Sequence, residues 1–261
     1  MEKDSTLRKI IHNILYIVIF ILIWQAVVSI FHIKEFVLPS PFQVLGRLFI
    51  PAQAKQYHWI LHISATLSVV LSAFVVSIIL GILLAILICW SKLFSDIIMP
   101  IIVLFNSLPK IAFTPLFLIW FGYGYLPNLF IAFLVAFFPI VLNTCTGLMA
   151  VDDDLLDLVN YLGASKRQLF LKIRIPNSLP YIFAGIKISV TMCVMGTIVG
   201  EFVAAEKGLG YLLRDAQAFI DMPTMFCCLI LLSVIGLSLF SLVKFLEKKC
   251  MPWNNKEVIN D

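Results

Sequence analysis

The sequence predicts an all-α fold, a single bundle of six helices that cross a membrane. Of the 261 residues, 61% are hydrophobic and only 13% are charged, whereas a soluble domain carries roughly 25% charged residues. The apolar residues form six long runs, and about 20 such residues span the hydrocarbon core. Because lipid cannot hydrogen-bond an open backbone, such runs must be helices. They do not alternate polar with apolar residues, which argues against a strand barrel.

The six runs occur in order along the chain. The first exceeds the apolar core of a signal peptide, which is about 7–15 residues long, and no small-x-small cleavage site follows Ile33, so we expect a retained helix. The sequence thus predicts a cytoplasmic N-terminus, one transmembrane domain and a cytoplasmic tail, at residues 1–13, 14–250 and 251–261. The expected spans are 14–33, 63–90, 97–121, 126–150, 181–203 and 225–245.

The basic residues predict that both termini lie in the cytoplasm. The chain carries 19 Lys and Arg against 15 Asp and Glu. With both ends inside, most of the basic residues fall in the inner loops, as the positive-inside rule requires. The net charge of +4 is therefore a topology signal, and it gives no reason to invoke nucleic acid as a partner.

Small residues and prolines predict how the helices pack and bend. Small residues spaced four apart allow close approach of helices in lipid, and prolines kink or break helices. We therefore expect close packing of the second and fifth runs, and bends or breaks in the third and fourth. The small residues are Ser64, Ser68 and Ser72; Ala73, Ser77, Gly81 and Ala85; and Gly196 and Gly200. The prolines are Pro100, Pro109, Pro115, Pro127 and Pro139.

The sequence lacks the motifs of catalytic and metal-binding proteins. It has no G-x-x-x-x-G-K-[ST] loop, so we expect no ATP hydrolysis by this chain. H-E-x-x-H is absent, all four histidines lie in the first quarter, and the six cysteines show no C-x-x-C spacing. We predict no catalytic residue, no metal site and no cofactor, which argues against a membrane-embedded enzyme.

The long inner connection, 151–180, has the pattern of helix, turn, helix. It begins with three aspartates, which favour a helix N-terminus, and apolar residues follow at helical spacing. Gly163 interrupts this pattern, and a second amphipathic piece over 166–173 ends before Pro176. Connections in bundles usually have ~2–8 residues. This one therefore either docks a partner or rests on lipid headgroups as an interfacial helix, and the pattern leaves both readings open.

Within this connection, 157–163, nine further residues and then 173–176 resemble the E-A-A-x-x-x-G-x₉-I-x-L-P signature of binding-protein-dependent ABC importer permeases. Three positions match, and Asp and Ile stand conservatively for Glu and Leu. The departure is a Leu-Val pair where the signature has two alanines. The resemblance implies an ATPase-coupling loop formed by Asp157, Leu158, Val159, Gly163, Ala164, Ser165, Ile173, Ile175 and Pro176.

Further stretches are similar to the nitrate/sulfonate/taurine-type permeases: 39–41, 108–115, 120–122, 137–139, 200–201 and 208–211. The resemblance implies a multi-pass protein of a bacterial cell membrane that pairs with a second copy. Its other implied partners are two separate ATPase subunits and an extracytoplasmic binding protein. A small anion such as a sulfonate, taurine or nitrate is the favoured cargo. The same group includes permeases for thiamine-precursor pyrimidines and other vitamins, which are the alternative.

Two charged residues are candidates for the transport pathway. Lys110 lies in the third run, where it either attracts an anion or reaches the interface from a later helix start. Glu201 lies near the outer end of the fifth run, where it either gates the outer mouth or anchors at the interface. A stand-alone secondary transporter is the rival class, and it predicts inverted repeats and paired charges within the spans. The sequence shows neither convincingly.

Overall fold

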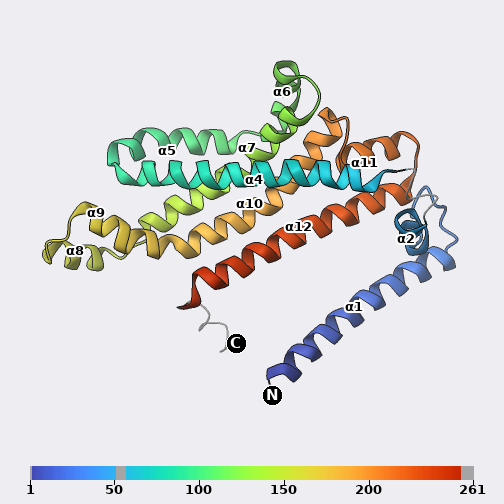
Figure 1. Cartoon of the computed structure of the whole chain (residues 1–261), viewed down its shortest axis with the longest axis horizontal. Coiled ribbons are helices and arrows are strands. Elements are labelled where there is room, and N and C mark those ends of the chain that lie inside the picture. The colour runs from blue at the N-terminus through green and yellow to red at the C-terminus, as the bar shows by residue number, and fades with distance from the viewer. Residues whose placement is uncertain (1, 51–56, 254–261) are drawn as a thin grey trace.

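The computed structural model describes residues 2–50 and 57–253. These residues form helices joined by short connections, with no β-strand among them, which confirms the all-α prediction for the described chain (Figure 1). The helices are α1 Glu2–Ile30, α2 Pro41–Phe49, α4 Trp59–Trp90, α5 Lys92–Ser107, η1 Lys110–Phe113, α6 Thr114–Phe121, α7 Tyr125–Met149, α8 Asp153–Tyr161, α9 Lys166–Leu169, η2 Phe170–Arg174, α10 Ile175–Ala204, α11 Leu209–Ala218 and α12 Met222–Cys250.

Four helices of the described chain are long and apolar enough to cross a membrane: α4, α7, the continuous helix Lys166–Ala204, and α12. The helix α5 and the segment Lys110–Phe121 together pass as a fifth, broken span, with an angle of 83° between the two pieces. The described apolar part of α1, Leu15–Ile30, is shorter than a full span. The structure therefore supports four or five spans, and the expected count of six is not confirmed.

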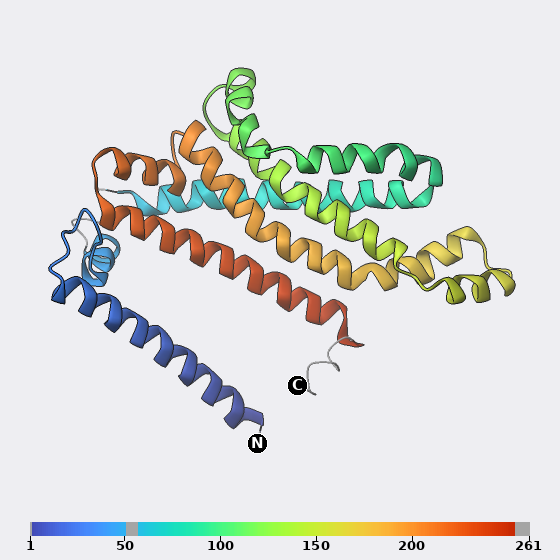
Figure 2. The same ribbon diagram turned by 180° about the vertical axis from the view of Figure 1, so that it is seen from behind.

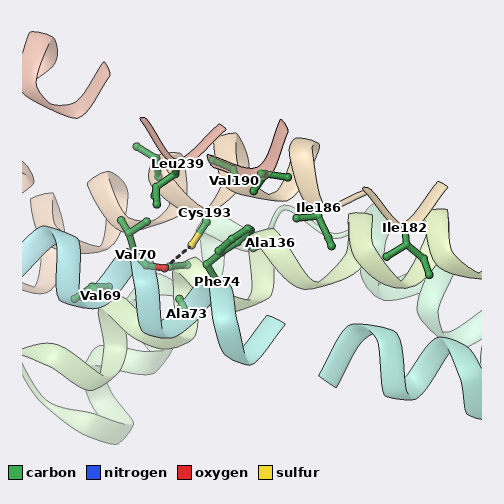
Figure 3. Packing of buried hydrophobic residues seen from close by; sticks show 13 residues of the cluster. Val69, Val70, Ala73, Phe74, Ala136, Ile182, Ile186, Val190, Cys193 and Leu239 are labelled. Carbon is green, nitrogen blue, oxygen red and sulfur yellow. Dashed lines mark hydrogen bonds between the residues drawn. The ribbon is translucent and has the colours of Figure 1, made fainter. Parts of the chain in front are cut away.

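The centre of the bundle is α7, which packs between α4 and α10. Val70 and Ala73 of α4, Ala136 of α7 and Cys193 of α10 are fully buried there, and Leu239 of α12 closes one side (Figure 3). The Cys193 thiol donates a hydrogen bond to the backbone carbonyl of Val70 over 3.4 Å, drawn as the dashed line in Figure 3. The apolar runs thus bury their small and branched residues against one another.

Close approach of these helices depends on the small residues that the sequence singles out. A Cβ added to Gly81 of α4 would lie 2.9 Å from Ile140 Cγ2, and one added to Gly196 of α10 would lie 2.9 Å from the Ala132 Cα. The packing prediction is confirmed for 73–85 and for the glycine pair of α10.

The first small-residue ridge behaves differently. Ser64 and Ser68 are exposed, and each donates its hydroxyl to a carbonyl of its own helix, Leu61 at 2.9 Å and Ala65 at 2.7 Å. Within the described chain these two serines do not pack against another helix, whereas the third, Ser72, is half-buried and lies 2.5 Å from the Tyr125 hydroxyl of α7. The helix turns its Val69 side toward the core instead.

The prolines act as predicted in one span and differently in the other. Between α5 and η1, Pro109 has an extended backbone (φ −71°, ψ 90°), and the span breaks there. In contrast, α7 runs without interruption through Pro139. Hydroxyls of Ser77 and Ser189 donate to the α7 carbonyls of Phe133 and Ala136. These bonds join α7 to its neighbours α4 and α10 near the proline.

The second piece of the inner connection does not end before Pro176 as the sequence predicts. It continues through a π-helical turn, η2, into α10, and the N–H of Ile175 donates to the Phe170 carbonyl five residues back. A wider π turn tolerates a local mismatch in the hydrogen-bond ladder, so a proline directly after it sits in the first turn of α10 without breaking the helix.

Candidate functional site

The candidate coupling loop, α8 to η2, projects from one end of the bundle. In Figure 1 it lies far from α2 and α11, which cover the opposite end, and Figure 2 shows the same separation from behind. The first helix, α8, begins as the sequence predicts. The side chain of Asp152 accepts a hydrogen bond from the Asp154 N–H at 2.9 Å, and two further acidic groups occupy the first turn. Their negative charges interact favourably with the positive end of the helix dipole.

The turn after α8 requires the backbone freedom of glycine. Gly163 has φ +77°, a region that costs other L-residues about 1–2 kcal/mol. Its N–H donates to the Asn160 carbonyl at 2.9 Å, and the Ala164 N–H donates to the Val159 carbonyl at 3.2 Å. These bonds close the C-terminal end of α8.

Ser165 then starts the second helix with a reciprocal pair of hydrogen bonds. Its hydroxyl accepts from the Gln168 N–H at 3.2 Å, and the Gln168 side chain accepts from the Ser165 N–H at 2.8 Å. This capping box satisfies two donors that would otherwise be free. The helix-turn-helix prediction is confirmed. Ile173 and Ile175 lie half-buried at the entry to α10, and Pro176 is exposed beside them.

One face of α8 carries large apolar side chains that nothing in the described chain covers. Leu158 is 55% exposed, Tyr161 91% and Leu162 74%. We call these three residues the apolar tip. Asp157 beside them is also exposed, and Val159 is half-buried. Clustered exposed apolar groups on a loop mark an interaction surface, and only the tertiary structure shows that these particular residues form it.

Lys110 lies at the break between α5 and η1. Its ammonium group donates to the Asn106 carbonyl at 2.6 Å and to the Asn106 side-chain oxygen at 2.9 Å. It also lies 5.1 Å from the ring centre of Phe138, within the range of a cation–π contact. The side chain is half-buried and thus has partners within its own chain.

Glu201 is 1% exposed and lies inside the bundle, at the end away from the coupling loop. Its carboxylate accepts from the Thr66 hydroxyl at 2.9 Å and from the Gly210 N–H at 2.8 Å. Gly208 lies directly against the carboxylate, where any Cβ would overlap it. The stretches 200–201 and 208–211, which both resemble the permease family, are therefore in direct contact. Through these contacts Glu201 links the connection between α10 and α11 to α4.

His62 and Thr66 were missed by the sequence reasoning. His62 Nδ1 accepts from the Gly208 N–H at 3.0 Å, and its ring stacks on Tyr211 with centres 5.8 Å apart. The Thr66 hydroxyl accepts from the Leu209 N–H at 2.8 Å. A usable signal exists in the sequence, because these two polar residues stand four apart and so share one face of an otherwise apolar helix.

A cavity of about 420 Å³ lies near this same end of the molecule, between α4, the start of α7 and the connection after α10. Its wall includes Ser64, Ser68 and Asn128, and one acid and one base, Glu206 and Lys207, line it as well. Asn128 is 2% exposed, and its side-chain oxygen has no hydrogen-bond partner in the described chain. The cavity thus has a mostly apolar wall with a few polar groups, and its one acid and one base balance in charge.

Comparisons with known proteins identify the family. Residues 77–251 match the family described as binding-protein-dependent transport system inner membrane component. The formylaminopyrimidine transport permease protein ThiX of Halalkalibacterium halodurans is 33% identical over 93% of this chain and 96% of that protein. The riboflavin transport system permease protein RibX of Chloroflexus aurantiacus is 35% identical, over 91% and 88%.

A narrower match is the putative aliphatic sulfonates transport permease protein SsuC of Bacillus subtilis, 32% identical over 63% of this chain and 59% of that protein. A structure titled as an inward-facing conformation of the MetNI methionine ABC transporter shares the fold. Its TM-score is 0.58 at 20% identity, covering 73% of this chain and 93% of that one. The chain therefore belongs to the family of binding-protein-dependent inner membrane components, the permeases of ABC importers.

Proposed function

We propose that this permease carries a small solute inward after delivery by a binding protein, and that its α8–α9 loop couples it to a separate ATPase subunit. The apolar tip carries this proposal. An amphipathic helix that leaves Leu158, Tyr161 and Leu162 uncovered needs a groove on a partner. The signature residues from Asp157 to Pro176 hold that helix in place, and Gly163 supplies the bend.

Paired substitutions test the coupling role. Tyr161→Ser removes the most exposed apolar side chain of the tip, whereas Tyr123→Ser removes an equally large side chain, 68% exposed, between α6 and α7. After mild-detergent purification from the native host, we expect the tip variant to lose the ATPase and the control to retain it. Equal ATPase retention by both variants would contradict docking through the tip.

A second pair tests the bend. Gly163→Val places a β-branched residue at φ +77°, where it is strained, whereas Gly163→Asn tolerates this conformation. We expect valine to abolish cargo-stimulated ATP hydrolysis and asparagine to preserve most of it, with both proteins inserted in the membrane. If the purified chain transports cargo without any ATPase, the stand-alone transporter becomes the better reading.

For the cargo, we propose an uncharged, vitamin-like heterocycle ahead of the sulfonate, taurine or nitrate anion that the subfamily resemblance favours. The relatives named for formylaminopyrimidine and riboflavin match over nearly all of this chain, and the sulfonate relative matches over 63%. The cavity beside Asn128 supports the same choice. The Asn128 amide nitrogen carries two donors that suit the acceptor atoms of a heterocycle, and the lining has no excess positive charge.

The complete importer, reconstituted with its binding protein, distinguishes these cargoes. We expect formylaminopyrimidine or riboflavin to stimulate ATP hydrolysis, and taurine and nitrate to leave it unchanged. Asn128→Ala should weaken the stimulation, while Thr144→Ala, a buried polar residue on the same helix and outside the cavity, should not. Stimulation by an anion that is lost in Lys110→Gln would reverse the assignment and make Lys110 the pathway residue.

A further inference from the structure

The structure contains a basic cleft for which the coupling role does not account. It has a volume of about 770 Å³ and lies between the turn that joins α4 to α5 and the face of the coupling loop toward the bundle. Three cationic side chains line it, Lys92 from the turn and Lys166 and Arg174 from the loop, and its lining contains no carboxylate.

The cations of the basic cleft have no counter-charge in the described chain. The Nε of Arg174 is buried without a hydrogen-bond partner, and no ion pair among the described residues involves the cleft's two lysines. Elsewhere Lys187 lies 2.8 Å from Glu247 and Arg47 lies 3.2 Å from Asp221, while the half-buried Lys110 and Arg214 donate hydrogen bonds to carbonyl groups. A guanidinium Nε–H that is buried without a partner is costly, and together with the two unpaired lysines it favours an anion in the cleft.

The position of the cleft indicates where that anion comes from. On α8, successive residues turn by about 100°, so Asn160, which lines the cleft, lies on the side roughly opposite Leu158 and Leu162 of the apolar tip. If the tip faces the ATPase, as proposed above, the cleft opens away from that subunit and toward the membrane surface.

Two further features match the headgroup layer. Trp90, the last residue of α4, lines the cleft and contacts Phe170 edge-to-face, with ring centres 5.0 Å apart. Tryptophan at the end of a spanning helix is typical of the membrane interface. Next to Lys92, the exposed side chains of Leu93 and Phe94 provide an apolar surface for acyl chains.

We propose that the basic cleft binds the phosphate group of an anionic phospholipid. Arg174 and Lys92 contact the phosphate from the loop and from the α4–α5 turn, and Lys166 adds charge at the rim. Basic pockets between membrane helices on the cytoplasmic side suit such headgroups. The lipid would join the spanning helices to the coupling loop, and so hold the loop in position for its partner. The inference that the cleft opens toward the membrane rests on the proposed docking of the apolar tip to the ATPase, whereas the need for an anion does not.

The test measures which lipid the complete permease–ATPase complex retains. The complex is purified from mixed phosphatidylglycerol and phosphatidylcholine membranes, and the retained lipids are quantified. We expect enrichment of phosphatidylglycerol in the wild type, lowered about fivefold for each charge removed in Arg174→Gln and Lys92→Gln. Arg167→Gln, an exposed cation of the same loop that does not line the cleft, should retain the enrichment.

The remaining outcomes separate the sources of the anion. Equal enrichment in all variants, or none in the wild type, overturns the proposal. Binding of inorganic phosphate in pure phosphatidylcholine, lost in the cleft variants but without lipid enrichment, assigns the cleft to a free anion and also overturns it. Loss of the ATPase from the cleft variants with lipid retained makes the cleft part of the docking surface instead.

Lys92→Gln keeps the test valid if Arg174→Gln misfolds, because Lys92 lies outside the signature. ATPase retention and lipid enrichment are separate readouts, so either proposal can fail alone.

Discussion

At the residue scale, Glu201 shows how one buried carboxylate organises the end of the bundle away from the coupling loop. Glu201→Ala would leave the Thr66 hydroxyl and the Gly210 N–H without their acceptor. Leaving buried groups unsatisfied costs about 1–3 kcal/mol each. We expect a clear fall in the thermal unfolding midpoint in detergent, a smaller one in Glu201→Gln, and none in Glu206→Ala, whose side chain is exposed. An unchanged midpoint in Glu201→Ala would show that the carboxylate does not stabilise this connection.

Asp221, just before α12, links stability to pH. Burial alone would raise the pKa of Asp221, but hydrogen bonds from Tyr57 and Thr224 and the charge of Arg47 outweigh it, so the pKa lies below its ordinary value of 3.8. A depressed pKa means that the ionised form stabilises the folded state above pH 3.8, and that this stability is lost as the pH falls through the folded-state pKa.

We therefore expect Asp221→Asn to lower the unfolding midpoint at pH 7 and to shrink the difference from wild type as the pH falls below about 4. Tyr57→Phe, which removes the 2.6 Å hydrogen bond to the carboxylate, should cause part of the same loss. The measurement is the unfolding midpoint followed by tryptophan fluorescence across this pH range. A constant difference at all pH values would exclude ionised Asp221 as the cause.

At the scale of the element, the π turn η2 sets the rotation of the coupling loop relative to α10. A π turn contains one residue more than an α-helical turn. Deleting Lys172 should convert it into regular helix and rotate α8 and α9 by about 100°. We expect the deletion to abolish ATPase retention, while Lys172→Ala keeps the π turn and retains the ATPase. Retention by the deletion variant would mean that the loop's orientation is not fixed by η2.

The elements also show where local sequence rules fail. Pro109 breaks its span, whereas Pro139 lies within an uninterrupted helix. Likewise, Pro176 follows a π turn and does not end the helix. A proline in an apolar run therefore does not by itself predict a break, because the surroundings of the helix also decide, and they are a tertiary property.

At the scale of the whole molecule, much of the apolar surface is exposed, as expected for helices that face lipid. α1 diverges from α12 toward its N-terminus in both views (Figures 1 and 2), and side chains such as Phe20 and Phe105 are exposed. We propose a pair of identical permeases with two ATPase subunits, and both termini in the cytoplasm. Co-expression of two differently tagged copies should give complexes that carry both tags. Recovery of only one tag per complex would contradict the homodimer.

The proposed orientation has its own test. Arg167→Cys lies in the coupling loop and Lys207→Cys in the connection after α10, at opposite ends of the molecule. In intact cells lacking the exposed Cys250, a membrane-impermeant maleimide should label Lys207→Cys and spare Arg167→Cys. The reverse pattern would place the loop outside the cell and contradict its contact with a cytoplasmic ATPase.

The sequence by itself determined the helical class, the four long apolar helices and the helix-turn-helix of the loop. These follow from local chemistry: apolar length, the acidic start of α8 and the glycine between the two helical pieces. Only the tertiary structure decided that Ser64 and Ser68 are exposed, that Glu201 fastens α11 onto α4, and that Lys92 shares a cleft with Arg174. Each of these depends on which side of a helix meets a neighbour, and that is set by packing between segments distant in the chain.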